Sequence, residues 1–301
     1  MMSVAQRMVR PVVVSCALAS VTLACGSGVR RVAPDGLDEV GPEAGSAMPG
    51  LGGFEDASLD GGGSSACRKM DIVFVIDNSF TMEEEQENLR KNFPRFAQVL
   101  DRFTTKSGEL LDYRVAVTST DSDRDKGAFR TNGGSGRPWL DRSDGIIVDA
   151  FSRRATLGTG GSSYERPLES LLLALTDRIA DGANGSFRRD DALLAFVILT
   201  DEDEGGAIED KPARPIVDYL SFLDGFTGNR ARWATALIAG LGPGRCESSF
   251  GEAYEATRLL DFVAKTGKNA TSSSICDSDL SNGLDKALRT FESACSSFVP
   301  R

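Results

Sequence analysis

The sequence predicts an α/β fold, a doubly wound and mostly parallel sheet flanked by helices. Short runs of aliphatic and β-branched residues alternate with segments whose apolar residues recur every three or four positions, as in amphipathic helices. The run LLAFVIL at 193–199 is apolar throughout, which is typical of a strand buried on both faces of a parallel sheet. These two observations indicate one α/β domain, at 67–299.

Each element of this domain follows from one of the two patterns. Strands are expected at the apolar runs 71–77, 112–119, 193–199 and 233–239. Helices are expected where leucine and phenylalanine recur at helical spacing, at 89–103, 168–179, 259–263 and 280–291. Pro94 should kink or restart the first helix, because it lacks an amide hydrogen. The segment GIIVDAF, at 145–151, is interpreted as part of an edge hairpin.

Residues 1–24 are predicted to be a signal peptide. Arg7 and Arg10 precede the apolar segment PVVVSCALASVTLA, which is too short to span a bilayer. The segment ends in TLAC, which resembles a bacterial lipobox, although Thr22 stands where that motif usually has leucine. Cys25 would then be the lipidated N-terminus, and we expect a bacterial cell-envelope protein anchored by lipid to the outer membrane. Simple secretion, or release into the periplasm, is the alternative.

A glycine-rich linker is predicted at 25–66, since 11 glycines and few apolar residues occur between Gly26 and Ala66. The whole chain of 301 residues contains no histidine, which excludes Ser-His-Asp and Cys-His catalysis and histidine-ligated zinc. Its formal net charge is −10, and no run is rich in lysine or arginine. This charge pattern argues against nucleic-acid binding.

Four cysteines of the domain predict two disulfides, because their number is even and the protein is expected to be exported. Three pairings are possible. We favour Cys67 with Cys295, which flank the first strand and the last helix, and Cys246 with Cys276. Buried free thiols are the alternative, and zinc is disfavoured because the chain has no CxxC motif.

Acidic and hydroxyl side chains follow two of the predicted strands. The stretch MDIVFVIDNSFT places Asp77, Ser79 and Thr81 at the carboxyl end of the first strand, and LLAFVILTDEDE places Asp201 after the third. Ligands of open α/β sheets bind at this edge. Carboxylates and hydroxyls are hard oxygen donors, suited to Mg²⁺, Ca²⁺ or Mn²⁺. For DNSFT alone, an ordinary helix N-cap is the alternative.

These motifs resemble the von Willebrand factor A (VWA) domain. The metal-ion-dependent adhesion site of that family has the form DxSxS, then a threonine in a later loop and an aspartate after the central strand. Asp77 and Ser79 match directly, Thr81 keeps the hydroxyl of the last serine, and Asp201 matches the final aspartate. The resemblance implies that these four residues are metal ligands.

The middle loop, LGTGGSSYERPLES, offers two candidates for the remaining ligand. Ser162 stands six residues before Leu168, where the family has its threonine, and Thr159 has the matching side chain three residues earlier. We favour Ser162, with Thr159 as the alternative. The glutamates at 83–85 are interpreted as favourable charge in the first turn of a helix. Asp203 and Glu204 are interpreted as a solvated rim, with a second metal site as the alternative.

With its signal peptide and linker, the chain resembles bacterial VWA-domain lipoproteins. This resemblance implies a binding module rather than an enzyme, in which the open position of the cation accepts an acidic side chain of an unidentified protein partner. A VWA-fold structural module without a functional metal is one alternative. A haloacid-dehalogenase-like phosphatase with Asp77 as nucleophile is another, although Ser79 replaces the second acid of its DxDxT motif.

Cys25→Ser should release the mature protein from the membrane fraction, because the substitution removes the thiol that would carry the lipid. Fractionation of cells followed by immunoblotting measures this. A wild-type protein that is already found in the soluble fraction would contradict the lipoprotein interpretation.

Overall fold

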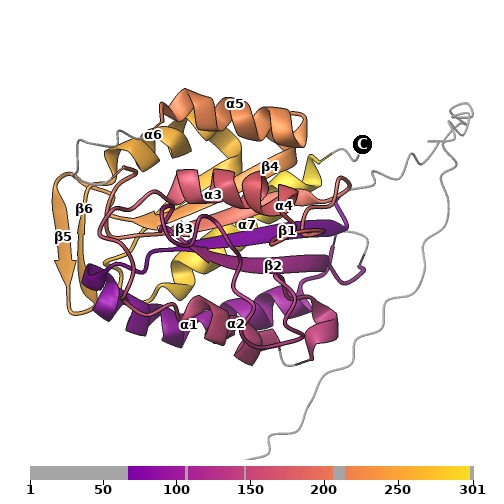
Figure 1. The fold of residues 1–301 in the computed structure, drawn as a ribbon, viewed down its shortest axis with the longest axis horizontal. Helices are drawn as coiled ribbons and strands as arrows, with labels where there is room; N and C mark the ends of the chain where they lie inside the picture. Colours follow the sequence, from indigo (N-terminus) through magenta and orange to yellow (C-terminus); the bar gives the residue numbers. More distant parts are fainter. Residues whose placement is uncertain (1–66, 106–107, 146, 206–213, 299–301) are drawn as a thin grey trace, which may run out of the picture. The chain divides into compact units, whose positions relative to one another are not determined.

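A parallel sheet of five strands forms the centre of the computed structural model (Figure 1), which describes residues 67–298 except 106–107, 146 and 206–213. The predicted signal peptide, Cys25 and linker lie outside the described residues. The strand order is β2-β1-β3-β4-β7, and every neighbouring pair is parallel. The strands are β1 (Lys69–Ile76), β2 (Asp112–Ser119), β3 (Leu193–Leu199), β4 (Trp233–Ala239) and β7 (Ala270–Ser274).

Helices cover both faces of this sheet, so the predicted α/β fold class is confirmed. One face packs against α1 (Glu83–Arg102), α2 (Ile147–Ala155) and α7 (Ser281–Ser296). The other packs against α3 (Pro167–Leu175), α5 (Ile216–Thr227) and α6 (Thr257–Thr266). Figure 1 shows α1 and α2 below the sheet and α3, α5 and α6 above it. The remaining helices are short: η1 (Phe80–Met82), η2 (Arg142–Asp144), α4 (Asp177–Ala180), η3 (Arg230–Arg232) and η4 (Gly267–Asn269).

The alternation of side chains along β1 separates these two hydrophobic layers. Phe74 faces the layer of α1 and α2, where its ring centroid lies 4.9 Å from those of both Phe96 and Phe151. Val73 and Val75 face the opposite layer. Because β1 is buried on both faces and paired on both edges, its carboxyl end is held in a fixed position.

Three expectations about individual elements are corrected by the structure. The segment GIIVDAF is not part of a hairpin, because Ile147, Ala150 and Phe151 recur at helical spacing and bury one face of α2. Of the two effects expected of Pro94, the restart is wrong, since α1 continues through this residue, and the kink stays a prediction. Strand β7 was not predicted, because its sequence ATSSS is polar and only partly buried at the sheet edge.

Two disulfides are present, in the pairing favoured from the sequence. Cys67 is joined to Cys295, with 5.0 Å between their Cα atoms, and Cys246 to Cys276, with 6.2 Å. Cys246 belongs to an antiparallel hairpin of β5 (Arg245–Ser248) and β6 (Gly251–Tyr254), which the sequence did not predict. Disulfides of this kind are compatible with an exported protein. Within the described residues, no helix combines the length and apolarity that a membrane span needs.

Removing each disulfide by a double Cys→Ser substitution should lower the free energy of unfolding by different amounts. The cysteines are separated by 228 positions in the first pair and by 30 in the second. Chain entropy alone then predicts losses of about 5 kcal/mol for Cys67/Cys295 and about 4 kcal/mol for Cys246/Cys276. Urea unfolding of both variants measures the difference. A larger loss for Cys246/Cys276 would show that native-state contacts of the hairpin, rather than chain entropy, dominate.

Candidate functional site

The candidate site lies where β1 and β3 end. These strands are parallel neighbours, and Ile76 of β1 pairs with Leu199 of β3. Asp77 directly follows β1, and Asp201 follows β3 after one residue. Both aspartates therefore lie at the same edge of the sheet. Figure 1 shows this edge on the left, where α1 begins and where the hairpin of β5 and β6 projects.

Asp77 is completely buried and its position is fixed by three hydrogen bonds. Its Oδ1 accepts from the backbone N–H of Ser79 at 2.8 Å, and its Oδ2 accepts from the hydroxyl of Thr200 at 2.7 Å. Its carbonyl oxygen accepts from Nε2 of Gln86 at 2.6 Å. The sequence interpretation missed Thr200, although its place directly before Asp201 was an available signal.

Ser79, Thr81 and Asp201 complete this cluster. The hydroxyl oxygens of Ser79 and Thr81 are 2.9 Å apart. Burial is the main cause that raises the pKa of Asp201, to about 7, and a hydrogen bond with Thr81 acts in the opposite direction. Oδ1 of Asp201 is buried and has no hydrogen-bond partner in the described part of the chain. The structure therefore brings together the four ligands predicted at these two strand ends.

The N-cap alternative for DNSFT is wrong. Helix α1 begins at Glu83. Met82 stands at its N-cap position and makes no capping hydrogen bond with its side chain. Ser79 occupies the N-cap position of the short helix η1, but its side chain makes no capping hydrogen bond there. The hydroxyls of Ser79 and Thr81 instead lie together beside the two aspartates.

The middle loop approaches the cluster through its backbone. The N–H of Gly161 donates to the carbonyl of Asn78 at 2.8 Å, which places Ser162 beside the DNSFT loop. The N–H of Ser162 donates to Asp121 at 3.1 Å, and its hydroxyl accepts from the N–H of Tyr164 at 3.0 Å. Among the described hydrogen bonds, none joins the side chain of Ser162 or Thr159 to the aspartates, so the choice between them stays a prediction.

Glu165 is the side chain of this loop that interacts with the aspartates, and the sequence interpretation missed it. It is completely buried. Its Oε2 accepts a hydrogen bond from Thr120, whereas its Oε1 has no partner among the described residues. Burial first, and then the charge of Asp77, raise its pKa to about 9. Only the hydroxyl pattern of the VWA family was sought in this loop, so an acid three residues after Ser162 went unnoticed.

The site therefore holds three buried acids whose ionised forms are destabilised unless a positive charge binds beside them. Burial raises the pKa of Asp77 as it does those of Asp201 and Glu165. In the part of the chain that the structure describes, no lysine or arginine forms an ion pair with any of the three. Isolated buried carboxylates are strongly unfavourable, so a cation fits this donor set.

The fit depends on the hydroxyls. Within the described residues, no group of three or more acidic or cysteine side chains is arranged to hold a metal ion. A cation here would therefore use the hydroxyl oxygens of Ser79 and Thr81 together with the carboxylates of Asp77 and Asp201. Oxygen donors of this kind suit Mg²⁺, Ca²⁺ or Mn²⁺.

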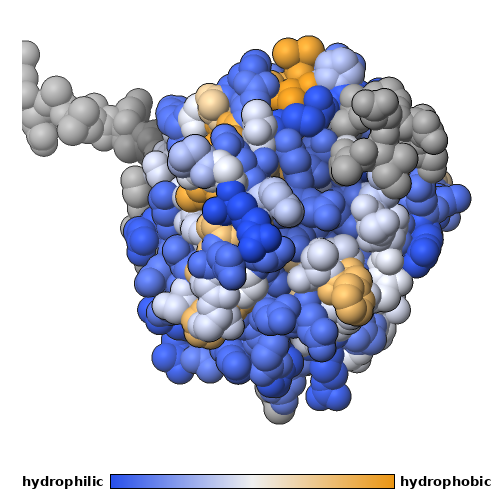
Figure 2. Space-filling model, turned by 90° about the vertical axis from the view of Figure 1, so that its left-hand side faces the viewer, coloured by the Kyte–Doolittle hydropathy of each residue, from blue (hydrophilic) through white to orange (hydrophobic). Residues whose placement is uncertain are grey.

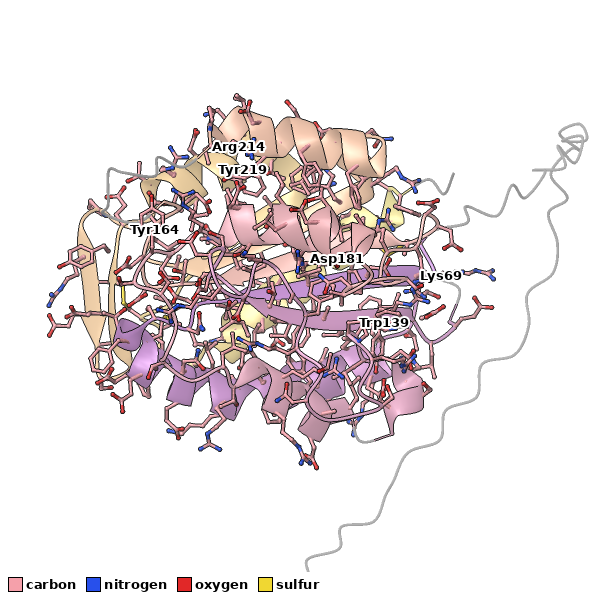
Figure 3. All side chains as sticks on the ribbon, in the orientation of Figure 1. Lys69, Trp139, Tyr164, Asp181, Arg214 and Tyr219 are labelled. Carbon is pink, nitrogen blue, oxygen red and sulfur yellow. A yellow bond between two sulfur atoms is a disulfide. The ribbon has the colours of Figure 1, made fainter. Side chains whose placement is uncertain are left out.

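The interpretation of Asp203 and Glu204 as a solvated rim is wrong. Glu204 is buried and accepts from the N–H of Leu168 at 2.7 Å, at the start of α3. It also accepts a hydrogen bond from the hydroxyl of Tyr219 at 3.1 Å. Figure 3 shows Tyr219 beside Arg214. Asp203 accepts from the N–H groups at the start of α6. Both acids cap helices and thereby fix the loop that carries Asp201.

The glutamates at the start of α1 differ from one another. Glu83 and Glu84 are exposed, as expected of favourable charge in a first turn. Glu85 is buried against Gly251 of the hairpin, and burial raises its pKa to about 7. This part of the earlier interpretation is corrected, because Glu85 belongs to the contact between α1 and β6.

A groove of about 520 Å³ runs from the cluster to the hairpin. Phe80, which lies between Ser79 and Thr81 in the sequence, lines this groove with 77% of its surface exposed. The lining residues are Phe80, Thr81, Glu83, Glu84, Glu247, Ser248, Ser249, Gly251 and Glu252. Figure 2 shows this end of the molecule, whose surface is mainly hydrophilic with small separate apolar patches.

Comparison with known proteins leaves the family open. No family model matches the chain, and no curated protein matches it. Among solved structures, it is similar to proximal thread matrix protein 1 from the mussel byssus, with 14% identity and a TM-score of 0.38 over 78% of this chain and 48% of that chain. A second crystal form of that protein matches with 16% identity and a TM-score of 0.41, over 78% and 49%.

The pilus adhesin SpaC from Lactobacillus rhamnosus GG, in an open conformation, matches with 11% identity and a TM-score of 0.43. The match covers 74% of this chain and 30% of the adhesin. The chain thus spans about half, or less, of the length of these structures. Similarity this low says nothing about what this chain binds.

Adding Mg²⁺ or Mn²⁺ should raise the Tm of the wild-type protein. A ligand that binds only the folded state stabilises it by about 2.7 kcal/mol at a hundredfold excess over Kd. Asp77→Ala should abolish the shift because it removes a central carboxylate, whereas Thr81→Ser should keep it because the hydroxyl stays. Of Ser162→Ala, Thr159→Ala and Glu165→Gln, only the substitution of a true ligand should weaken the response. Differential scanning calorimetry with and without EDTA measures each.

Asp149→Ala is the matched control for these variants. Asp149 is an exposed residue of α2, remote in sequence from both strand ends, and its loss removes the same charge. This variant should respond to Mg²⁺ as wild type does. A normal response from Asp77→Ala would eliminate the metal site.

Proposed function

We propose that this chain is an exported binding module of the VWA class, which recognises a protein partner through a divalent cation. The observation that supports this most is the convergence of Asp77, Ser79, Thr81 and Asp201 at one sheet edge, where no basic residue of the described chain is paired with either aspartate. When bound, Mg²⁺, or Ca²⁺ or Mn²⁺, would supply a positive charge with a position open to an acidic side chain of the partner.

The residues around the site hold its donors in place. Thr200 and Gln86 fix Asp77 from two sides. The backbone carbonyl of Asp201 accepts from the N–H of Tyr254 at 3.1 Å, so the hairpin is attached directly to the loop that carries this ligand. Two of the four donors are uncharged hydroxyls, so a bound cation would have only two anionic donors and could still accept a further anionic oxygen. A rigid site of this kind favours binding because little order must be created when the partner arrives.

The groove beside the site limits what the partner can be. Four glutamates give the groove negative charge: Glu83 and Glu84 on one wall, and Glu247 and Glu252 on the other. Arg245 compensates part of this charge, because it forms ion pairs with Glu247 at 2.9 Å and with Glu252 at 2.8 Å. A segment with several acidic residues would be repelled. The fitting partner therefore presents one acidic side chain among neutral or basic neighbours, with an apolar group against Phe80.

Binding is favoured over catalysis by the residue that stands two positions after Asp77. The phosphatase alternative needs a second acid there, and this chain has Ser79 instead. A structural module without metal differs from our proposal in one measurable respect, because its Tm would not change when divalent cations are added.

The location of the protein is part of the proposal. The two disulfides are compatible with export, and the lipobox-like TLAC at Cys25 favours a lipid anchor in the bacterial cell envelope, at the outer membrane. A partner would then be a protein of the envelope or of the space around it.

Pull-down from a cell-envelope extract tests the proposed function. The mature protein should retain a partner in Mg²⁺ and release it in EDTA, and Asp77→Ala should retain none, since the cation that contacts the partner is lost. Asp149→Ala, which keeps the site, should behave as wild type. Equal recovery of the same partner in Mg²⁺ and EDTA, and by Asp77→Ala, would contradict metal-dependent recognition.

A further inference from the structure

A second groove, of about 440 Å³, lies apart from the candidate metal site. It is formed by the loop that follows β2 and by the end of α2. Its lining residues are Asp125, Ala128, Phe129, Arg130, Thr131, Asn132, Arg154, Thr156 and Leu157. None of these residues belongs to the predicted metal site, and two of them are arginines, which is notable in a chain with a net charge of −10.

Arg154 is completely buried and only partly satisfied. Its Nε donates to the carbonyl of Asn132 at 3.3 Å and its Nη2 to that of Gly133 at 3.0 Å, but its Nη1 has no hydrogen-bond partner among the described residues. Burial lowers its pKa, and the charge of Asp144 offsets this only in part. Asp144 is itself bound by Arg137 at 2.8 Å. A buried guanidinium without its own counter-charge is unfavourable, so the groove has an unmet need for an anion.

Arg130 provides a second guanidinium in the same groove. Its Nη2 binds Asp125 at 2.6 Å, while its Nε is buried and has no partner in the described chain. Asp125 also accepts from the hydroxyl of Ser119 at 2.6 Å. The one carboxylate that lines the groove is therefore already engaged by Arg130 and Ser119, and it leaves Arg154 uncompensated.

The rest of the lining is both polar and apolar. Thr131 adds an exposed hydroxyl. Phe129 and Leu157 add apolar surface, and Phe129 is held against Phe187 with 4.9 Å between ring centroids. A few convergent polar groups beside apolar side chains are typical of sites for small molecules.

We propose that this groove binds a small organic anion, in which a carboxylate or phosphate group meets the partly exposed Arg130 and an apolar part meets Leu157, while the uncompensated charge of the buried Arg154 attracts the anion from within the wall of the groove. The planar guanidinium matches these oxyanions, because its N–H groups point in parallel at two oxygens. The site is separate from the residues proposed to bind the cation, so each can fail without the other.

Phenyl phosphate is the probe that combines both parts, and inorganic phosphate and phenol are its separate halves. Isothermal titration of the mature protein at constant ionic strength, with EDTA present to exclude the metal site, should show saturable binding of phenyl phosphate, weaker binding of phosphate and none of phenol. Benzoate in place of phenyl phosphate decides whether the preferred group is carboxylate or phosphate. Failure of all four compounds to bind would overturn the proposal.

Substitutions then locate the site. Arg130→Gln should weaken phenyl phosphate binding about tenfold or more, because one charged hydrogen-bond donor is lost. Arg153→Gln is the matched control, since Arg153 is an exposed neighbour on the same turn of α2 and does not line the groove. Arg154→Lys keeps the charge but loses the hydrogen bonds to the carbonyls of Asn132 and Gly133 that hold the wall of the groove, so this variant should bind phenyl phosphate more weakly than Arg153→Gln does.

Circular dichroism establishes which variants fold. If Arg154→Lys does not fold, the comparison of Arg130→Gln with Arg153→Gln decides alone, because side-chain exposure of Arg130 is 33% and its loss leaves the buried core intact. Equal affinities of these two variants for phenyl phosphate would overturn the proposal. Unchanged Mg²⁺ stabilisation of Arg130→Gln would show that the two sites are independent.

Discussion

Burial of three carboxylates at one sheet edge is the constraint on which the rest of this end of the molecule depends. Asp77, Asp201 and Glu165 come from three separate segments, and none has a basic partner in the described structure. Like charges at close range repel more strongly in a protein interior than in water. Such an arrangement persists only if the surrounding structure holds the acids together, and Thr200 and Thr120 do so by hydrogen bonds to two of them.

The parallel sheet is what makes this possible. Thr200 and Asp77 are 123 positions apart in sequence, but they are hydrogen-bonded because β1 and β3 are neighbours with their carboxyl ends at one edge. Hydrophobic layers on both faces fix the two strands, and Glu204 and Asp203 cap α3 and α6 so that the loop after β3 is held at both sides. Polar groups at the edge are therefore positioned by apolar packing behind them.

The sequence was informative where burial alone determines structure. Strands β1, β3 and β4 are apolar along most or all of their length, and the acids that follow β1 and β3 could be placed at one edge before the structure was known. Strand β7 and helix α2 were missed because their patterns are short: ATSSS carries no apolar signal, and in GIIVDAF a helical spacing of buried residues was interpreted as extended. Glu165 was missed for a different reason, since a carboxylate that is buried only by tertiary contacts is indistinguishable in sequence from a surface one.

The disulfide between Cys67 and Cys295 has a mechanical consequence. The described chain begins at the amino end of β1, whereas the candidate site lies at the opposite, carboxyl end of the same strand. A force that pulls these two ends apart would act along β1, parallel to its hydrogen-bonded neighbours β2 and β3. The hydrogen bonds from β1 to both neighbours would then have to break together by shear, rather than one at a time. The disulfide passes part of that load to α7 before it reaches the sheet. A binder held through its N-terminal segment, as proposed above, would be pulled in this direction.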